Sequence, residues 1–279
     1  GYVWIGGNGA GDSHILKFTQ DGKFIAQYGK KNARAKAAAG PGTGEGQVAG
    51  FEGGSNDPNN FGRVAKIFVD QKDNEAFIAD GYLNKRVAVL DADTGKMKRF
   101  WGAYGNKPDD SPMPAYDPAA APGTPASGHV QQFRNPVHCA DESVDRFVYV
   151  CDRVNDRMQV FTTDGKFVKE QYYHTNARSD GSVWDIAFSR DPQQRWIFMA
   201  DGVNDKIRVV DRQSLQEITN FGDGGRQPGQ FYAVHSIAID KEGNLYTTET
   251  YEGKRVQKFV YKGMAPVTAM DQGTPWAGK

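Results

Sequence analysis

The chain has 279 residues, of which 34 are basic and 34 acidic, so its formal net charge at pH 7 is zero. A balanced charge creates no overall field toward a polyanion, and we therefore expect no nucleic-acid partner. No apolar run approaches the eighteen or so residues of a transmembrane helix, so we also expect no membrane span. A chain of this length can hold two average domains or one large all-β domain.

Five copies of one sequence unit follow one another along the chain. Each has a short apolar run, a polar turn, an alternating run that opens with a basic residue in most copies, a tight turn and a second alternating run. Alternation with a period of two between turn residues is typical of antiparallel strands. The copies begin near Val3, Phe77, Val148, Ile197 and Leu245, and the first and last are the weaker ones.

A further apolar segment precedes each of the last four copies: VAKIFVD, VHCADES, VWDIAFS and VHSIAID. Four antiparallel strands per repeat make the blade of a β-propeller. We therefore predict an all-β propeller domain over residues 1–262 and a tail at 263–279, which either covers a sheet edge or hangs free.

The first repeat lacks an inner strand and the last lacks a clear outer strand, so about four and a half to five blades are present. Because open sheet edges are a liability, we expect a propeller of six blades, with most of one lying before Gly1 or supplied in another way.

Acidic residues end the second strand of four repeats, and Gly7 holds the same position in the first repeat, 73 residues before Asp80. The acidic residues are Asp80, Asp152, Asp201 and Glu249, separated by 72, 49 and 48 residues. The enlarged steps between these positions locate two insertions. The insertions lie near 30–60 and 103–132 and are rich in Gly, Pro, Ala and Asp. Long loops on one face often form lids or line a binding site. The alternative is that these loops are loosely ordered and have no binding role.

The acidic residues recur too regularly to be catalytic. We expect them to cap turns and to pair with the basic residues that open the next strand. These are Arg86, Arg157, Lys206 and Arg255.

Histidine occupies one equivalent position in two repeats. His138 lies fourteen residues before Asp152, and His235 lies fourteen residues before Glu249. In a propeller, equivalent positions surround the axis, and imidazoles that converge there form a site for Zn²⁺ with open positions for water or substrate. The alternative is that each histidine only hydrogen-bonds water in a polar channel.

Two other repeats lack histidine at this position. It holds Ala65 or Lys66 in the second repeat and Trp184 in the fourth. Histidine thus falls on alternate repeats, as an axial site with ligands about 120° apart in six blades requires.

Tyr82 and Arg153 closely follow two of the acidic residues and should lie at the same mouth of the propeller. A phenol and a guanidinium beside a metal can act as a general base and as an anchor for a carboxylate or oxyanion. Both residue types are also common in turns, so the types alone do not establish these roles.

Cys139 and Cys151 lie one residue inside the His138 and Asp152 positions. If these strand ends pair, the two cysteines face each other, and antiparallel neighbours can come within disulfide reach. The alternative is a pair of small buried thiols. Their spacing is not that of a structural zinc site.

These repeats resemble the NHL-repeat β-propellers, and among them the peptidyl-α-hydroxyglycine α-amidating lyases. The likeness extends from Val3 to about Lys262, without the inserted loops. The segment DGYLNKRV at 80–87 is similar to the one that bears the family's catalytic tyrosine. The segment CDRVNDRMQVF at 151–161 resembles the one that bears a catalytic arginine.

The resemblance implies Tyr82 as the base and Arg153 as the contact for a carboxylate or oxyanion. It also implies His138 and His235 as two of the three histidines that hold the family's zinc, with the third lying before the first residue given. We do not expect the family's calcium site, because Ser236 stands where the family has aspartate.

We therefore expect a secreted or periplasmic, metal-dependent propeller with a lyase-like activity on a small hydroxylated amide of the peptidyl-α-hydroxyglycine type. The alternative is a non-catalytic NHL propeller that binds a protein, peptide or glycan on its top face. A calcium-dependent lactonase would need carboxylates and an asparagine at the axis, where this chain offers histidines. RNA binding fits poorly with zero net charge.

Overall fold

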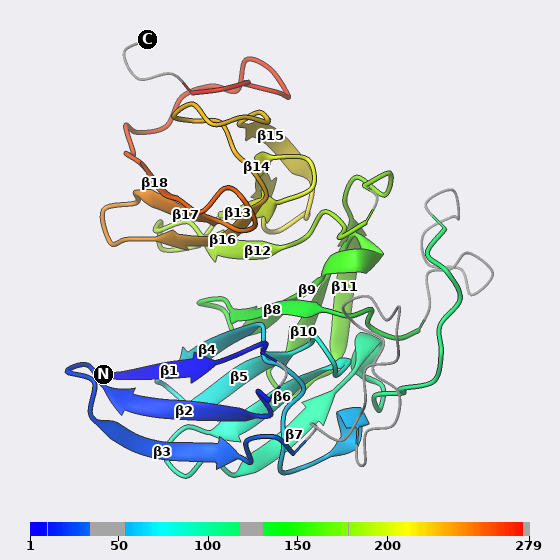
Figure 1. The fold of residues 1–279 in the computed structure, drawn as a ribbon. Helices are drawn as coiled ribbons and strands as arrows, with labels where there is room; N and C mark the ends of the chain where they lie inside the picture. Colours follow the sequence, from blue (N-terminus) through cyan, green and yellow to red (C-terminus); the bar gives the residue numbers. More distant parts are fainter. Residues whose placement is uncertain (10, 34–53, 118–130, 178, 276–279) are drawn as a thin grey trace. The chain divides into compact units, whose positions relative to one another are not determined.

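The computed structural model describes residues 1–9, 11–33, 54–117, 131–177 and 179–275. These residues form five antiparallel sheets of consecutive strands, three with four strands and two with three. Their helical segments are short 3-10 turns, and the described part of the chain contains no α-helix. The protein is therefore an all-β chain of five propeller-type blades (Figure 1).

The prediction of six blades is wrong, because the described residues contain five sheets. The lower estimate of about five blades within the chain agrees with the structure. Six followed from the argument that a further blade must cover open sheet edges. The number of blades depends instead on how neighbouring sheets pack, which a repeat pattern does not specify.

Each blade pairs its strands in chain order. The first blade contains β1 (Tyr2–Gly6), β2 (His14–Thr19) and β3 (Phe24–Gly29). The second contains β4 (Lys66–Asp70), β5 (Glu75–Asp80), β6 (Arg86–Asp91) and β7 (Met97–Trp101). The third contains β8 (Val137–Glu142), β9 (Phe147–Asp152), β10 (Arg157–Thr162) and β11 (Phe167–Tyr172).

The fourth blade contains β12 (Asp185–Phe188), β13 (Trp196–Asp201), β14 (Lys206–Asp211) and β15 (Glu217–Phe221). The fifth contains β16 (Val234–Ile239), β17 (Leu245–Glu249) and β18 (Val256–Phe259). The 3-10 turns are η1 (Gly54–Asn56), η2 (Ala103–Gly105) and η4 (Arg153–Asn155).

The chain divides into two compact units. Unit 1 comprises residues 1–142, 148–152 and 159–169. Unit 2 comprises residues 143–147, 153–158 and 170–279.

The core of unit 1 lies on both faces of β5 and β6. Successive strand side chains point to opposite faces, so an apolar strand that is buried on both sides carries few polar residues between its ends. One face packs against β8, which contacts both β4 and β5. It presents Phe77, Ala79, Val87 and Val89 to Val137, Val148, Val150 and Phe161. The other face presents Ala76, Ile78, Ala88 and Leu90 to Ile15 and Phe61.

The core of unit 2 lies where β12 and β13 contact β16. Its main members are Trp184, Ala200, Ile207, Phe231, Val234 and Ile237. In both units the first strand of one blade thus packs near the first strand of the next, which is the packing expected of neighbouring propeller blades.

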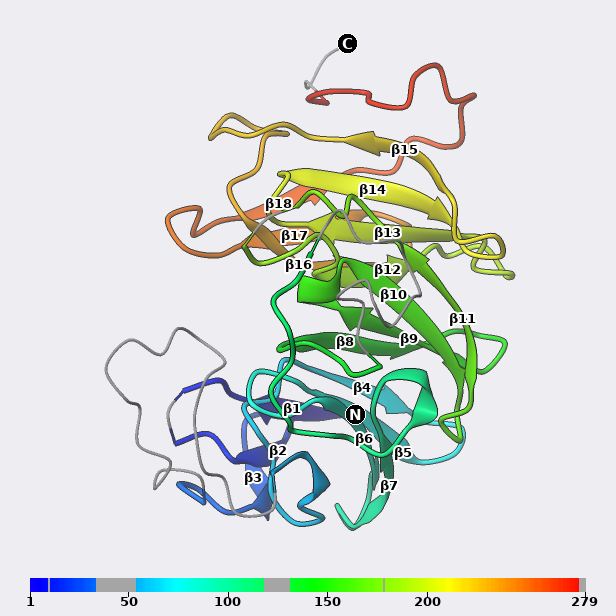
Figure 2. The ribbon, with the colours of Figure 1, turned by 90° about the vertical axis from the view of Figure 1, so that its right-hand side faces the viewer.

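The described part of the tail covers the outer edge of β15 (Figure 2). The backbone N–H of Asn220 donates a hydrogen bond to the backbone oxygen of Met270. The backbone N–H of Gln272 donates to the backbone oxygen of Asn220. Lys206 binds Asp271 at 2.8 Å. Backbone groups at the otherwise open edge of β15 thereby form hydrogen bonds within the chain.

The predicted insertions near 30–60 and 103–132 lie partly outside the described residues. Within unit 1 their described ends meet, because the Ser55 amide donates to Oδ2 of Asp110 at 2.7 Å. None of the helical segments in the described ranges is long and apolar enough to span a membrane.

Candidate functional site

His138 is the extra residue of a β-bulge at the start of β8. Val137 pairs with Asp152 and Cys139 pairs with Cys151, so the register shifts by one residue between Val137 and Cys139. A bulge turns a side chain out of the regular alternation, and bulges are common beside functional sites.

The same bulge recurs at the start of β16. Val234 pairs with Glu249 and Ser236 pairs with Thr248, which makes His235 the extra residue. The two histidines that the spacing placed at equivalent positions therefore share one local backbone geometry.

The corresponding strands of the second and fourth blades start differently. The β4–β5 and β12–β13 pairs run without a register shift over their described lengths. The amide of Ala65 donates to Ala79 O at 2.9 Å, and that of Trp184 donates to Ala200 O at 3.0 Å. Ala65, rather than Lys66, is thus the counterpart of Trp184. Among these four strand pairs, the two with the bulge are the two that carry histidine.

Tyr82 lies against His138 within unit 1. Its Oη is 3.0 Å from Nε2 of His138, and the two rings meet edge to face with centroids 5.7 Å apart. Gly81 permits this approach, because a Cβ there would lie 1.9 Å from the Val137 carbonyl oxygen. The Asn135 side chain donates to Gly81 O at 2.8 Å and holds the loop in place. Two of the predicted site residues are therefore in contact.

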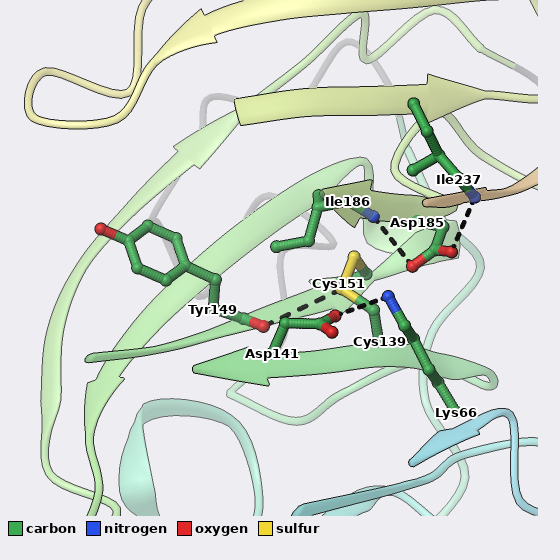
Figure 3. Close-up of a disulfide and its surroundings, with 8 residues drawn as sticks. All are labelled: Lys66, Cys139, Asp141, Tyr149, Cys151, Asp185, Ile186 and Ile237. Carbon is green, nitrogen blue, oxygen red and sulfur yellow. Dashed lines mark hydrogen bonds and ion pairs between the residues drawn. A yellow bond between two sulfur atoms is a disulfide. The ribbon is translucent and has the colours of Figure 1, made fainter. Parts of the chain in front are cut away.

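A disulfide joins Cys139 and Cys151 directly beside this bulge (Figure 3). The two residues are fully buried cross-strand partners with Cα atoms 4.8 Å apart. Of the two alternatives that the sequence left open, the structure thus contains the disulfide. On the same strand as Cys139, Asp141 forms a salt bridge with Lys66, with Nζ and Oδ2 2.8 Å apart.

Arg153 lies in unit 2 as a buried cation, 4% exposed. Its guanidinium carbon is 4.5 Å from the centroid of the Trp184 ring, which is the distance of a cation–π contact. Its Nη2 donates to Oδ1 of Asp180 at 3.0 Å, and the Tyr251 hydroxyl donates to the other oxygen of that carboxylate at 3.1 Å.

His235 touches the same tryptophan. The rings of His235 and Trp184 meet edge to face with centroids 5.4 Å apart, and Nδ1 of His235 is 3.0 Å from Oγ of Ser236. Burial lowers the pKa of His235, the charge of Arg153 lowers it further, and Asp185 opposes both effects. The neutral imidazole, which is the form that binds metals, is favoured as a result. Asp185 itself accepts the amides of Ile186 and Ile237 (Figure 3).

Both histidines fit zinc by the chemistry of their donor atoms. Zinc binds imidazole through a ring nitrogen that carries no proton. At His138, binding through Nε2 replaces the hydrogen bond to Tyr82, whereas binding through Nδ1 keeps it. At His235, binding through Nε2 would keep the contact between Nδ1 and Oγ of Ser236, which helps to orient the ring.

The acidic residues support turns, and Asp80 and Glu249 have their predicted basic partners. Asp80 accepts Nε of Arg86 at 2.8 Å, and Glu249 accepts Nε of Arg255 at 2.5 Å. Both carboxylates are buried, so each needs such a partner.

In the fourth blade the predicted pairing of Asp201 with Lys206 is wrong. Their backbones are register partners, yet Nε of Arg208 donates to Asp201 at 2.7 Å. Arg208 lies two residues further along the same face, and its longer side chain reaches back to the carboxylate. Lys206 instead binds Asp223 and Asp271.

Asp180 and Tyr251 were not predicted from the sequence, and Trp184 was identified only as the residue in place of a histidine. Asp180 and Tyr251 lie in loops without periodic patterning. The one available signal was Trp184 itself, since a large aromatic side chain at that position offers a face to a nearby cation.

No family model matches the chain. Among solved structures it is similar to virginiamycin B lyase from Staphylococcus aureus, with 14% identity, a TM-score of 0.49, and coverage of 94% of this chain and 67% of that one. It is similar to Kuenenia stuttgartiensis hydrazine synthase, with 15% identity, a TM-score of 0.49, and coverage of 75% and 49%. For U3-55K the identity is 12%, the TM-score 0.47 and the coverage 71% and 51%.

The chain therefore spans about half the length of the hydrazine synthase and U3-55K chains. Similarity at this level does not specify an activity.

Proposed function

We propose that the protein is a zinc-dependent lyase of the α-amidating type, which cleaves a peptidyl-α-hydroxyglycine or similar carbinolamide into an amide and an aldehyde acid. Besides the sequence resemblance, one observation carries the proposal. Tyr82 Oη lies 3.0 Å from Nε2 of a histidine placed on a bulge. A base for a metal-activated hydroxyl must stand beside the metal ligands, and this phenol stands beside one.

His138 and His235 are the proposed zinc ligands. Both are the extra residues of equivalent bulges, and the lowered pKa of His235 favours its metal-binding form. Zinc bound there would act as a Lewis acid toward the substrate hydroxyl.

Tyr82 is the proposed base. As the phenolate, it takes the proton of the substrate hydroxyl and becomes the phenol, while the carbon–nitrogen bond breaks and the carbonyl of the aldehyde acid forms. The same proton is delivered to the departing amide nitrogen, so no net proton is consumed. The hydrogen bond to His138 orients the phenol for this transfer.

Arg153 is the proposed contact for the substrate carboxylate. Its guanidinium is a cationic hydrogen-bond donor and is held against the ring of Trp184. It already holds a carboxylate, that of Asp180, at 3.0 Å, which supports a role in carboxylate binding.

Turnover of an N-acyl-α-hydroxyglycine by the zinc-loaded protein tests the proposal. We expect amide and glyoxylate from the wild-type protein and a loss of about 10²-fold or more in kcat for Tyr82→Phe. Tyr261→Phe, at a tyrosine that is 51% exposed, is the matched control and should keep full activity.

No turnover by the wild-type protein would favour the non-catalytic binding protein instead. Full turnover by Tyr82→Phe would remove the tyrosine from the mechanism while leaving the lyase in place.

We also propose that the protein folds in an oxidising compartment, as a secreted or periplasmic protein does. The Cys139–Cys151 disulfide supports this, since disulfides persist in such compartments and are rare in the cytosol. Thiol labelling of the protein taken directly from its own cells should detect free cysteines only after reduction. Labelling before reduction would contradict the proposal.

A further inference from the structure

In unit 2, the side chains of Arg153 and Tyr251 together hold the carboxylate of Asp180. Each oxygen of Asp180 receives one donor: Nη2 of Arg153 at 3.0 Å and Oη of Tyr251 at 3.1 Å. One charged and one neutral donor, each on its own oxygen, are enough to orient a small carboxylate. The guanidinium also makes a cation–π contact with the ring of Trp184.

Asp180 is the solvent-facing member of this group. Its side chain is 33% exposed, whereas that of Arg153 is 5% exposed. A buried guanidinium requires a counter-charge, and Asp180 supplies it when no ligand is bound. An external carboxylate in the same place would keep the charge balance and use the same two donors.

The backbone on one side of Asp180 is anchored to Arg153. Gly181 has a φ of 73°, and a Cβ there would lie 2.0 Å from the Arg153 carbonyl oxygen. Gly181 O also accepts Nε1 of Trp184 at 2.6 Å. On the other side Ser179 is exposed and has a φ of 68°. Displacement of the Asp180 carboxylate would therefore require its side chain to rotate, with the backbone at Gly181 held beside Arg153 and Trp184.

We propose that Asp180 is an internal competitor at a carboxylate-binding site made by Arg153 and Tyr251, and that the ligand is a small carboxylate that displaces it. The inference rests on the proposed function in so far as Arg153 contacts the substrate carboxylate there. Competition gives selectivity, because a neutral ligand that displaced Asp180 would not replace the negative charge that it removes from beside Arg153. Only a ligand with its own carboxylate restores the negative charge of the displaced Asp180 side chain.

Calorimetric titration with hippurate, and with hippuramide as its neutral counterpart, tests this inference on the full chain. We expect Asp180→Asn to bind hippurate about fivefold more tightly than wild type, since a competing ion pair that is open to water on one side has been removed. Asp180→Ser removes the same charge with a smaller side chain and should give the same gain. Hippuramide should bind weakly to every variant.

Asp145→Asn is the matched control, because it removes the same charge from a partly exposed aspartate in the same unit that pairs with Arg212 at 2.7 Å. It should leave hippurate binding unchanged. Tyr251→Phe in the Asp180→Asn background should weaken hippurate binding by about threefold, the loss of one neutral hydrogen bond that water partly replaces.

An unchanged dissociation constant in both Asp180 variants, an equal gain in Asp145→Asn, or no hippurate binding by any variant would overturn the inference. Turnover of the α-hydroxyglycine substrate separates this from the lyase proposal. Tighter hippurate binding without any turnover would keep the competitor and reject the lyase. Turnover with an unaltered KM in Asp180→Asn would keep the lyase and reject the competitor.

Discussion

The β8–β9 hairpin of the third blade and the β16–β17 hairpin of the fifth have the same bulge with the same residue type, but they stabilise it differently. In the third blade a disulfide crosses the strands beside the bulge, and His138 is 3% exposed. In the fifth blade Ser236 and Thr248 stand in the places of the two cysteines, and His235 is only half-buried. The bulge therefore does not depend on the covalent link. We infer that the link restricts the first histidine more than packing and hydrogen bonds restrict the second.

Of the changes considered for these two hairpins, removing the disulfide should lower the stability of the protein most. Replacing Cys139 and Cys151 by serine opens a loop whose ends are 12 residues apart in sequence. The expected loss is about 3 kcal/mol in the free energy of unfolding, measured by urea denaturation. The paired change of Ser236 and Thr248 to alanine in the other hairpin is the control and should cost less. A loss below about 1 kcal/mol on removing the disulfide would contradict the account.

A side chain at Gly81 should disturb the third blade alone. Gly81→Ala places a Cβ against the backbone of Val137, so the loop must move away and the hydrogen bond between Tyr82 and His138 must break. We expect a loss of about 2 to 3 kcal/mol in stability, as for other overpacked sites. The NMR signals of the His138 ring should shift while those of His235 stay in place. A shift of both signals, or of neither, would show that Gly81 does not act through this contact.

Lowering the pH should reduce the stability of unit 2, which contains the β16–β17 hairpin. Burial alone would raise the pKa of Glu217, but its hydrogen bond with His174 and the charge of Arg208 bring it from 4.5 to about 2. A carboxyl whose pKa is lowered by folding stabilises the protein fully above the unfolded value, and that contribution is lost as pH falls from about 4.5 toward about 2.

The expected loss over this range is about 2 kcal/mol, measured by denaturant titrations at several pH values. Glu217→Gln should lack this part of the pH dependence. The same acid slope in Glu217→Gln as in wild type would exclude Glu217 as its source.

The smallest effect is expected at Ser236. Ser236→Ala removes the hydroxyl beside Nδ1 of His235 and should cost about 0.5 to 1 kcal/mol in stability, the contribution of one hydrogen bond. Differential scanning calorimetry measures this against Ser214→Ala, a turn serine that hydrogen-bonds Asp211 in the same unit. A loss above about 2 kcal/mol would mean that Ser236 supports the bulge itself.

Much of the fold follows from the sequence because strand periodicity is local. Alternation located the strands, and counting back from Asp152 and Glu249 found His138 and His235, which share one bulge. The number of blades did not follow, since it depends on packing between sheets rather than on the repeat. The choice of Arg208 over Lys206 as the partner of Asp201 depended on side-chain reach.

The loop part of the candidate site was the least predictable. Tyr82 and His138, both predicted site residues, are in contact, but the bulge that carries His138 has no sequence signature. Asp180 and Tyr251 come from separate loops, 71 residues apart, and only the folded chain brings them together.

Metal content is the most direct test of the central claim, which is that the two bulge histidines bind zinc. Elemental mass spectrometry on the full-length protein, dialysed after exposure to zinc, should find about one zinc ion per chain. The His138→Ala, His235→Ala double variant should have lost it, and His174→Ala should have kept it, since His174 is engaged with Glu217 at 2.8 Å. No zinc in the wild-type protein, or zinc retained by the double variant, would contradict the claim.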